Sequence, residues 1–339
     1  MKRIRPITHR HFLSTADWSQ AELQGLLDSA AQLRGKRDEG LAGKKAALIF
    51  YNPSLRTRTS FQVAMLEQGG DAIVLDAAGT WPLEIEDGVV MDGTAEEHVR
   101  EAARVLSTYV DVICIRAFPK FQDWQVDRQD MLIRAFAEHA TVPVVNMETI
   151  VHPCQELALM RTLQDRLGEV KKKKFVLTWT YHPKPLNTAV ANSALLISSK
   201  FGMDVTLLCP TPEYLLDERY MTAAENFAKE YGGSLTISHD PEEAYDGADV
   251  VYAKSWGALP YFGRWEDEKP IRDAHQHFIV DEKKMALTNN GLFSHCLPMR
   301  RNIKVTDAVA DSPNAVFIEE AANRLPVQKA VLKTLLGGE

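Results

Sequence analysis

The chain has 339 residues, of which 45% are hydrophobic and 25% charged, with a formal net charge of −7. This composition is typical of a soluble globular protein of about two domains. The negative balance excludes the basic footprint of a nucleic-acid-binding protein. No run approaches the ~18 consecutive apolar residues that a membrane-spanning helix needs. We therefore expect neither a nucleic-acid nor a membrane partner.

The four cysteines are widely spaced and form no C-x-x-C pair; they are Cys114, Cys154, Cys209 and Cys296. This pattern argues against a disulfide framework and against a zinc site, and it suits a reducing cytoplasm. The glycines form no G-x-G-x-x-G motif, so a nicotinamide cofactor is not expected either.

The first half of the chain alternates between predicted helices and strands. Ser19 and Glu22 form a capping box that predicts a helix reaching toward Arg34. A long irregular stretch, 76–93, is of the kind that is usually functional or mobile. Apolar runs predict strands at 46–51, 72–75, 112–116 and 144–146, with helices at about 60–68 and 95–109. The alternation predicts a parallel α/β unit.

The same alternation begins again beyond a helix that opens at 152–156, which we take as the bridge between two domains. Strands are expected at 175–180, 204–208, 234–238 and 250–253, and helices at 187–201, 217–231 and 327–335. We predict an α/β protein of two domains, each a parallel sheet flanked by helices, with the active site in the cleft between them. The expected domains are 1–151, joined by a C-terminal helix 322–339, and 152–321.

The stretch Asn52 to Ser60 lies at a predicted strand-to-helix turn. The first N–H groups of a helix lack internal partners, and the helix dipole favours an anion there. Arg56 and Arg58 add planar forks that match a phosphate. The turn therefore predicts phosphate recognition, the alternative being a solvated helix start capped by Ser or Thr.

Further polar groups follow other predicted strands. Arg116 ends one strand, where it is either a ligand or simply the first solvated residue. His152 and Gln155 lie three apart at a helix start, so both can address one ligand. His295 precedes Cys296 directly, and adjacent residues do not face each other, so a thiol–imidazole nucleophile is not favoured.

Taken in order, Ser-x-Arg-Thr-Arg from Ser54, then Arg116, His-Pro-x-Gln from His152 and His-Cys-Leu-Pro from His295 resemble the signature of the aspartate/ornithine carbamoyltransferase family. Each motif alone is weak, but the ordered set spans nearly the whole chain. The resemblance implies an enzyme that moves a carbamoyl group from carbamoyl phosphate to an amine, with no metal and no organic cofactor.

The resemblance also implies which residues hold carbamoyl phosphate. Thr57, Arg116 and His152 would be catalytic, because they would contact the carbamoyl oxygen where charge develops during attack. Gln155 and the 296–297 backbone would receive the carbamoyl NH₂. The implied set is Ser54, Leu55, Arg56, Thr57, Arg116, His152, Gln155, Cys296, Leu297 and Arg324. Without the family, Arg324 would be interpreted as a surface charge at a helix start.

The chain departs from the ornithine-specific members where they hold an Asp and a Ser-Met-Gly loop; here the sequence is Ala253 to Pro260. Together with 81–82, 146–149 and 178–185, these departures resemble members that carbamoylate N-acetyl-L-ornithine to N-acetyl-L-citrulline in arginine biosynthesis. The acceptor residues implied are Trp81, Glu96, Glu148, Asn187 and Lys254. The acetyl cap leaves the α-carboxylate, which suits Lys254 as a point charge.

The resemblance further implies a homotrimer in which Trp81 enters a neighbour's site. Glu96, carried by the same loop, would repel a succinyl cap; otherwise it is an acidic residue in the first turn of a helix. Lys304 is implied to be N-carboxylated, the alternative being a plain surface lysine.

Two other functions stay open. Within the same class the acceptor would be ornithine or N-succinylornithine. In another class the chain would be a non-catalytic sensor of a phosphate ligand on the same fold. Loss of a phosphate arginine or of His152 would mark such a sensor, and the sequence retains these residues.

Overall fold

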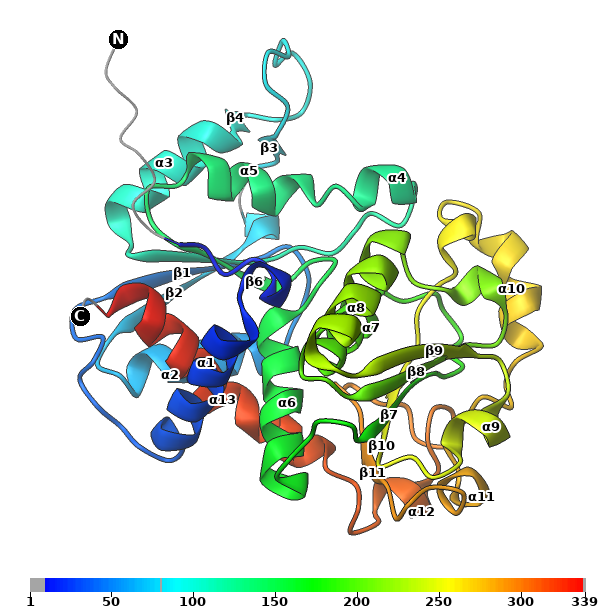
Figure 1. Ribbon diagram of the computed structural model, residues 1–339. Helices are drawn as coiled ribbons and strands as arrows, with labels where there is room; N and C mark the ends of the chain where they lie inside the picture. The colour runs from blue at the N-terminus through cyan, green and yellow to red at the C-terminus, as the bar shows by residue number, and fades with distance from the viewer. Residues whose placement is uncertain (1–9, 80, 338–339) are drawn as a thin grey trace.

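The computed structural model describes residues 10–79 and 81–337, so the expected domain limits at residues 1 and 339 lie outside the described residues. Two parallel sheets form the frame, with strand orders β2-β1-β5-β6 and β11-β10-β7-β8-β9. Helices flank both sheets, and the long helix α6 runs between them (Figure 1). The predicted α/β class and the two-sheet arrangement are thus confirmed.

The first sheet is built from short, apolar strands that the alternation had largely located. Its central strands are buried throughout most of their length, as parallel strands covered on both faces must be. The strands are β1 (Lys45–Phe50), β2 (Asp71–Asp76), β5 (Val112–Arg116) and β6 (Val144–Glu148). The helices of this half are α1 (Gln20–Leu33), α2 (Arg56–Leu66), α3 (Val99–Tyr109), α4 (Trp124–Asp127) and α5 (Met131–His139), with 3-10 turns η1 (Thr15–Asp17) and η2 (Ala77–Gly79). The predicted capping box of α1 is present, because Ser19 and Glu22 each bond the other's backbone N–H.

The second sheet repeats this arrangement. Its strands are β7 (Lys174–Trp179), β8 (Asp204–Leu208), β9 (Ser234–Ser238), β10 (Val250–Lys254) and β11 (Leu292–Ser294). Its longer helices are α6 (Pro153–Leu167), α7 (Ala189–Lys200), α8 (Glu218–Tyr231) and α10 (Trp265–Asp273). Its shorter elements are η3 (Pro212–Tyr214), η4 (Leu259–Tyr261), α9 (Pro241–Tyr245), α11 (Glu282–Met285) and α12 (Asp307–Ala310).

The C-terminal helix α13 spans Phe317–Leu336, so the predicted start at 327 was wrong by ten residues. Pro326 lies inside α13. A proline loses one helical hydrogen bond, and here burial of the surrounding helix offsets that cost. The helix packs on α6, α1 and α2, which returns the end of the chain to the first sheet (Figure 1).

Two polar contacts fasten the halves of the molecule to each other. The buried ammonium of Lys200, at the end of α7, donates to the carbonyls of Thr15 and Trp18 at 2.8 and 2.7 Å. On another side, the indole N–H of Trp124 donates to Asp217 at 2.5 Å. Among the described residues, no helix combines the length and apolar character needed to cross a membrane.

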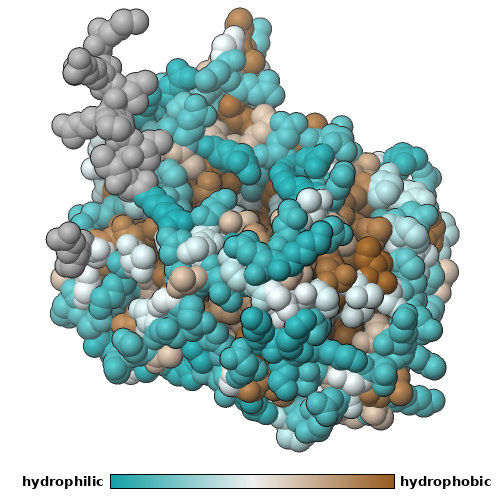
Figure 2. Space-filling view, in the orientation of Figure 1, coloured by the Kyte–Doolittle hydropathy of each residue, from teal (hydrophilic) through white to brown (hydrophobic). Residues whose placement is uncertain are grey.

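The segment between α2 and α3 projects from the body of the protein (Figure 1). It carries a two-stranded parallel ribbon of β3 (Leu83–Glu84) and β4 (Glu97–His98). Its tip is apolar and exposed, with Val90 82% accessible, and apolar atoms are visible at the tip in Figure 2. The helix after it starts at Val99, so the predicted start at 95 was wrong and Glu96 lies outside the helix.

Candidate active site

The strand-to-helix turn after β1 is organised around the start of α2. This helix begins at Arg56, four residues before the predicted start at Ser60. Leu55 occupies the capping position and supplies no capping side chain, while Ser54 Oγ accepts from the N–H of Thr57 at 3.1 Å. The first turn of α2 therefore offers backbone N–H groups, together with the Arg56 side chain, to an anion.

Three arginines from separate elements converge at this turn. Arg56 opens α2, Arg116 ends β5 and Arg324 lies in the middle of α13. Arg324 Nη2 donates to Thr57 Oγ1 at 2.7 Å, and Arg116 Nη1 bonds Glu148. In the described part of the chain, the buried Nε atoms of all three arginines lack a hydrogen-bond partner.

Burial and the closeness of the three guanidinium groups lower the pKa values of Arg324 and Arg56. Burial, and then repulsion from Arg56 and Arg116, lowers the pKa of Arg324 to about 10, although Cys154 and Glu148 oppose the change. Burial is also the main cause that lowers the pKa of Arg56. Because each shift disfavours the charged form, the cluster would be stabilised by an anion with several acceptor oxygens.

His152 adjoins the arginines at the start of α6. It is buried, and its Nε2 lies 3.5 Å from Glu148 Oε2. Burial, reinforced by Arg324 and Arg116, holds the pKa of His152 well below its usual value, so the imidazole is neutral near pH 7. Its buried Nδ1 finds no partner among the described residues. A neutral imidazole here can serve a ligand as a hydrogen-bonding group without bringing charge.

Gln155 and the segment after β11 are the residues expected to receive the carbamoyl NH₂. Gln155 Nε2 bonds Glu320, whereas its buried Oε1 lacks a partner in the described chain. Leu297 has φ 56°, a left-handed conformation that is strained for leucine and that is often found at functional sites. Burial raises the pKa of the Cys296 thiol, which agrees with the expectation that it is not a nucleophile.

A second group of basic side chains comes from the other sheet. Lys254 ends β10, and its charge contributes to lowering the pKa of both His152 and Lys304. Lys304 is buried rather than at the surface, and burial lowers its pKa to about 7. His295 Nε2 is 3.4 Å from Lys304 Nζ. The two sheets thus contribute to one continuous basic site.

Three of the residues expected to bind the acceptor form no hydrogen bond with the basic cluster in the described chain. Asn187 Nδ2 donates to the Thr149 carbonyl at 2.7 Å and its Oδ1 accepts from a backbone N–H, so its amide is occupied within the protein. Trp81 is 56% exposed and donates to Glu97 at 2.9 Å. Glu96 is exposed beside β4. The structure joins neither Trp81 nor Glu96 to the basic cluster of its own chain.

One residue that the sequence did not suggest is Glu320. It is fully buried on α13 and bonds Gln155, Tyr252 and Ser294. Glu320 and Arg324 are four residues apart, which places them on the same face of a helix. Extending α13 to 317 would have revealed this pair.

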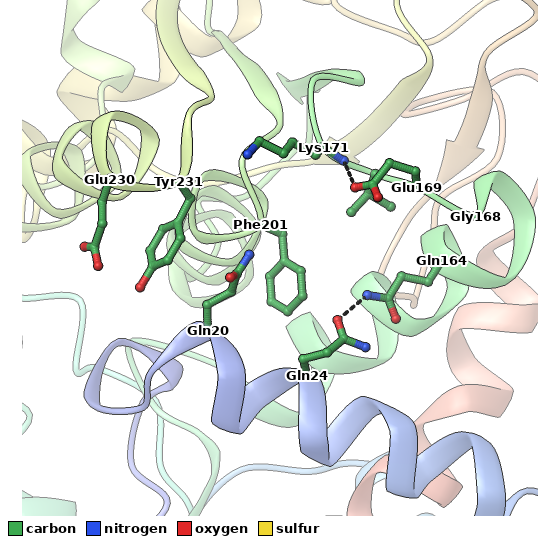
Figure 3. Close-up of a pocket in the computed structure, with 10 residues that line it drawn as sticks. Gln20, Gln24, Gln164, Gly168, Glu169, Lys171, Phe201, Glu230 and Tyr231 are labelled. Carbon is green, nitrogen blue, oxygen red and sulfur yellow. Dashed lines mark hydrogen bonds between the residues drawn. The ribbon is translucent and has the colours of Figure 1, made fainter.

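A surface pocket of about 430 Å³ lies elsewhere, among α1, α6 and α8 (Figure 3). Its polar walls come mainly from Gln20, Gln24, Gln164 and Glu230, and Gln164 donates to Gln24 at 2.8 Å. None of the expected site residues lines it. The pocket is therefore separate from the candidate active site.

Comparison with known proteins identifies relatives over nearly the whole chain. Residues 10–165 match the family described as aspartate/ornithine carbamoyltransferase, carbamoyl-P binding domain, and residues 184–335 match its Asp/Orn binding domain. The N-acetylornithine carbamoyltransferase of Xanthomonas campestris pv. campestris is 63% identical over 97% of this chain and 98% of its own length. The N-succinylornithine carbamoyltransferase of Bacteroides fragilis is 39% identical over 86% of this chain and 87% of its own.

A solved structure agrees with these matches. The crystal structure of acetylornithine transcarbamylase complexed with acetylcitrulline has a TM-score of 0.96 and 62% identity, and covers 97% of this chain and 100% of that chain. With both halves matched by the family and full-length relatives well above 30% identity, the chain belongs to the aspartate/ornithine carbamoyltransferase family.

Proposed function

We propose that this enzyme transfers the carbamoyl group of carbamoyl phosphate to the side-chain amine of N-acetyl-L-ornithine, giving N-acetyl-L-citrulline and phosphate for arginine synthesis. The observation that carries the proposal is the group of three buried guanidinium Nε atoms without partners in the described chain. A phosphate dianion supplies the acceptors and charge that the cluster needs. The 63% identity to an N-acetylornithine carbamoyltransferase supports the acceptor.

The carbamoyl oxygen is proposed to lie among Thr57, Arg116 and His152. Thr57 Oγ1 accepts a bond from Arg324, so the hydroxyl proton of Thr57 is free to donate toward the substrate. Negative charge grows on the carbamoyl oxygen as the amine attacks, and donors already in position stabilise that charge. Holding the two substrates in line supplies much of the remaining acceleration.

The acceptor amine must lose a proton before it attacks, since an alkyl ammonium has a reference pKa of about 10.4. Lys254 and the arginines surround the reaction centre with positive charge, and burial excludes water. Both effects lower the pKa of the bound ammonium. The departing phosphate is the proposed destination of the proton, so no dedicated base is required.

Ornithine and N-succinylornithine are the competing acceptors. A colorimetric citrulline assay with carbamoyl phosphate and each of the three amines distinguishes them, because the natural acceptor should have the highest kcat/KM.

We place residues 1–151 with the C-terminal helix on the carbamoyl-phosphate side and 152–321 on the acceptor side. We also infer a cytoplasmic reaction from the four unpaired thiols, which fractionation of the source cells would check.

The first prediction compares two arginines of the same turn. Arg56→Ala should raise the KM for carbamoyl phosphate by at least ~tenfold, because it removes charge-assisted bonds worth roughly 1.5–3 kcal/mol each. Arg58→Ala is the matched control, because its guanidinium bonds Asp76 and lies 4.9 Å from the ring centroid of Phe50. Equal kinetics for the two folded variants would remove Arg56 from the phosphate site.

The second prediction concerns assembly as a homotrimer with shared sites. The exposed Trp81 and the apolar tip at Val90 lie on one projecting segment, which supports its insertion against a neighbouring copy. Inactive Trp81→Ala subunits mixed with inactive Arg56→Ala subunits should regain part of the activity, because a hybrid trimer contains intact sites. Subunit exchange confirmed by mass spectrometry, without any recovery, would argue for sites made within one chain.

The third prediction is that Lys304 carries a carboxylate on its Nζ. Its pKa of about 7 leaves much of it as a free amine, which can attack CO₂ to form an N–C bond and release one proton. The backbone N–H of Leu297 donates to His295 Nδ1 at 2.8 Å, so the proton of neutral His295 lies on Nε2, facing Lys304. That N–H needs an acceptor: an ammonium cannot provide one, the free amine offers a single lone pair, and a carbamate offers carboxylate oxygens.

NMR of the enzyme in isotope-labelled bicarbonate should show one carbamate signal that disappears in Lys304→Arg. Lys283→Ala, at an exposed lysine, serves as the control and should retain the signal. A spectrum without a carbamate signal above neutral pH would contradict the assignment.

The fourth prediction concerns the acceptor's cap. Trp81 bonds Glu97, and Glu96 precedes the same ribbon, so both travel on one segment toward a neighbour's site. Like charges a few ångströms apart cost on the order of a few kcal/mol in a partly desolvated cleft. Glu96→Ala should therefore raise kcat/KM for N-succinylornithine relative to N-acetylornithine, with KM for carbamoyl phosphate unchanged.

Glu101→Ala, at an exposed glutamate in the first turn of α3, is the matched control and should leave the ratio alone. An unaltered ratio in Glu96→Ala would show that Glu96 does not set acceptor specificity.

A further inference from the structure

Glu320 occupies a buried position in contact with Gln155. It is completely buried on α13 and lies one turn before Arg324. Gln155 Nε2 and the hydroxyl of Tyr252 donate to its Oε1, the latter at 3.0 Å, and Ser294 Oγ donates to its Oε2. The carboxyl group thus receives bonds from α6, β10 and β11.

This arrangement determines which way the Gln155 amide faces. An ionised carboxylate accepts hydrogen bonds and cannot donate them, so Gln155 must present its NH₂ to Glu320. Its Oε1 is then turned away, and this buried atom has no partner among the described residues. If the amide were reversed, two acceptors would face each other behind the pocket and an NH₂ would face the substrate.

The orientation matters because the two ends of carbamoyl phosphate differ in hydrogen bonding. The carbamoyl NH₂ is a donor and needs an acceptor, whereas the phosphate oxygens are acceptors and are served by the arginines. Ser294 and Tyr252 hold the carboxylate from its other sides. Burial raises the pKa of Glu320 to about 7 against the opposing effect of these bonds and of Arg324, so the carboxylate dominates above that pH.

We propose that Glu320 is a positioning residue that fixes the Gln155 amide with its oxygen toward the carbamoyl NH₂, and thereby lets the enzyme distinguish carbamoyl phosphate from acyl phosphates that lack this NH₂. The inference rests on the proposed function, since it assumes that Gln155 meets the carbamoyl group. Glu320 itself touches no substrate. Its effect passes through Gln155.

The test uses acetyl phosphate, in which a methyl group replaces the NH₂, and inorganic phosphate. Affinities of the full-length enzyme for carbamoyl phosphate, acetyl phosphate and phosphate are measured by calorimetry at about pH 8, where the carboxylate dominates. Glu320→Gln should weaken carbamoyl phosphate by about tenfold, because the new amide lets Gln155 turn either way, with both other ligands unchanged. A general structural defect would instead weaken all three ligands, and that outcome, or an unchanged carbamoyl-to-acetyl ratio, would overturn the proposal.

A control variant and two further variants show whether the effect comes from the Glu320 carboxylate. Glu319→Gln, on the same helix but paired with Arg166 at the surface, should leave all three affinities unchanged. Should Glu320→Gln fail to fold, Tyr252→Phe and Ser294→Ala each remove one bond to the carboxylate, and should lower the carbamoyl-to-acetyl ratio in part. Ratios equal to that of the parent enzyme in both would overturn the proposal.

Gln155→Leu separates this inference from the function on which it rests. It should lower the carbamoyl-to-acetyl ratio by itself, and adding Glu320→Gln should lower it no further. A normal ratio in Gln155→Leu would contradict the assignment of Gln155 to the carbamoyl group. A lowered ratio there, with a normal ratio in Glu320→Gln, would contradict the role of Glu320 alone.

Discussion

The site depends above all on buried positive charge that the chain itself balances only in part. Arg56, Arg116 and Arg324 face one another, and Glu148 bonds Arg116. Unpaired charge inside a protein is costly, so the surrounding fold has to hold these side chains against their mutual repulsion. A phosphate dianion removes that repulsion and fills the free Nε positions at the same time. The arrangement of the three arginines therefore favours an anion on electrostatic grounds alone.

The topology explains how such charges are brought together. Parallel strands place their carboxyl ends at one edge of a sheet, which gathers the start of α2, the end of β5 and the β6–α6 turn. Arg324 reaches the same point because α13 returns across α6 and α2. Lys254, His295 and Lys304 come instead from the second sheet. The three arginines thus meet at the edge of the first sheet, and the second sheet contributes a separate group of basic side chains.

The sequence was sufficient for the sheets but not for the helix ends. Apolar runs located every strand of the two sheets except β11, and β5, β8 and β9 match the predicted limits. β5 is buried throughout, as its continuous hydrophobicity predicts, whereas β9 is largely exposed. Helix starts were less certain. Arg56 opens α2 in a segment that resembles a polar turn, and Pro326 lies within α13 although proline usually ends a helix.

These errors had consequences for the site. With α13 started too late, Arg324 resembled a surface charge at a helix start, and Glu320 fell outside every predicted element. Family motifs recovered Arg324 but carried no information on Glu320. Asn187, which the family resemblance implied as a ligand, also bonds the backbone through both amide atoms. Tertiary contacts of this kind cannot be inferred from periodicity.

Arg324 and Lys304 differ in the pH range over which they keep their positive charge. Arg324 stays protonated at neutral pH although its pKa is lowered to about 10, whereas the pKa of Lys304 is about 7. Arg324 is therefore cationic at neutral pH, while Lys304 can lose its positive charge there. Each positive charge retained there favours the neutral, reactive form of the incoming amine. Neutralising Lys304, or carboxylating it, weakens that effect and reduces the crowding of cations around Lys254. Under the proposed function, the charge of Lys304 would therefore affect both deprotonation of the acceptor amine and repulsion from Lys254.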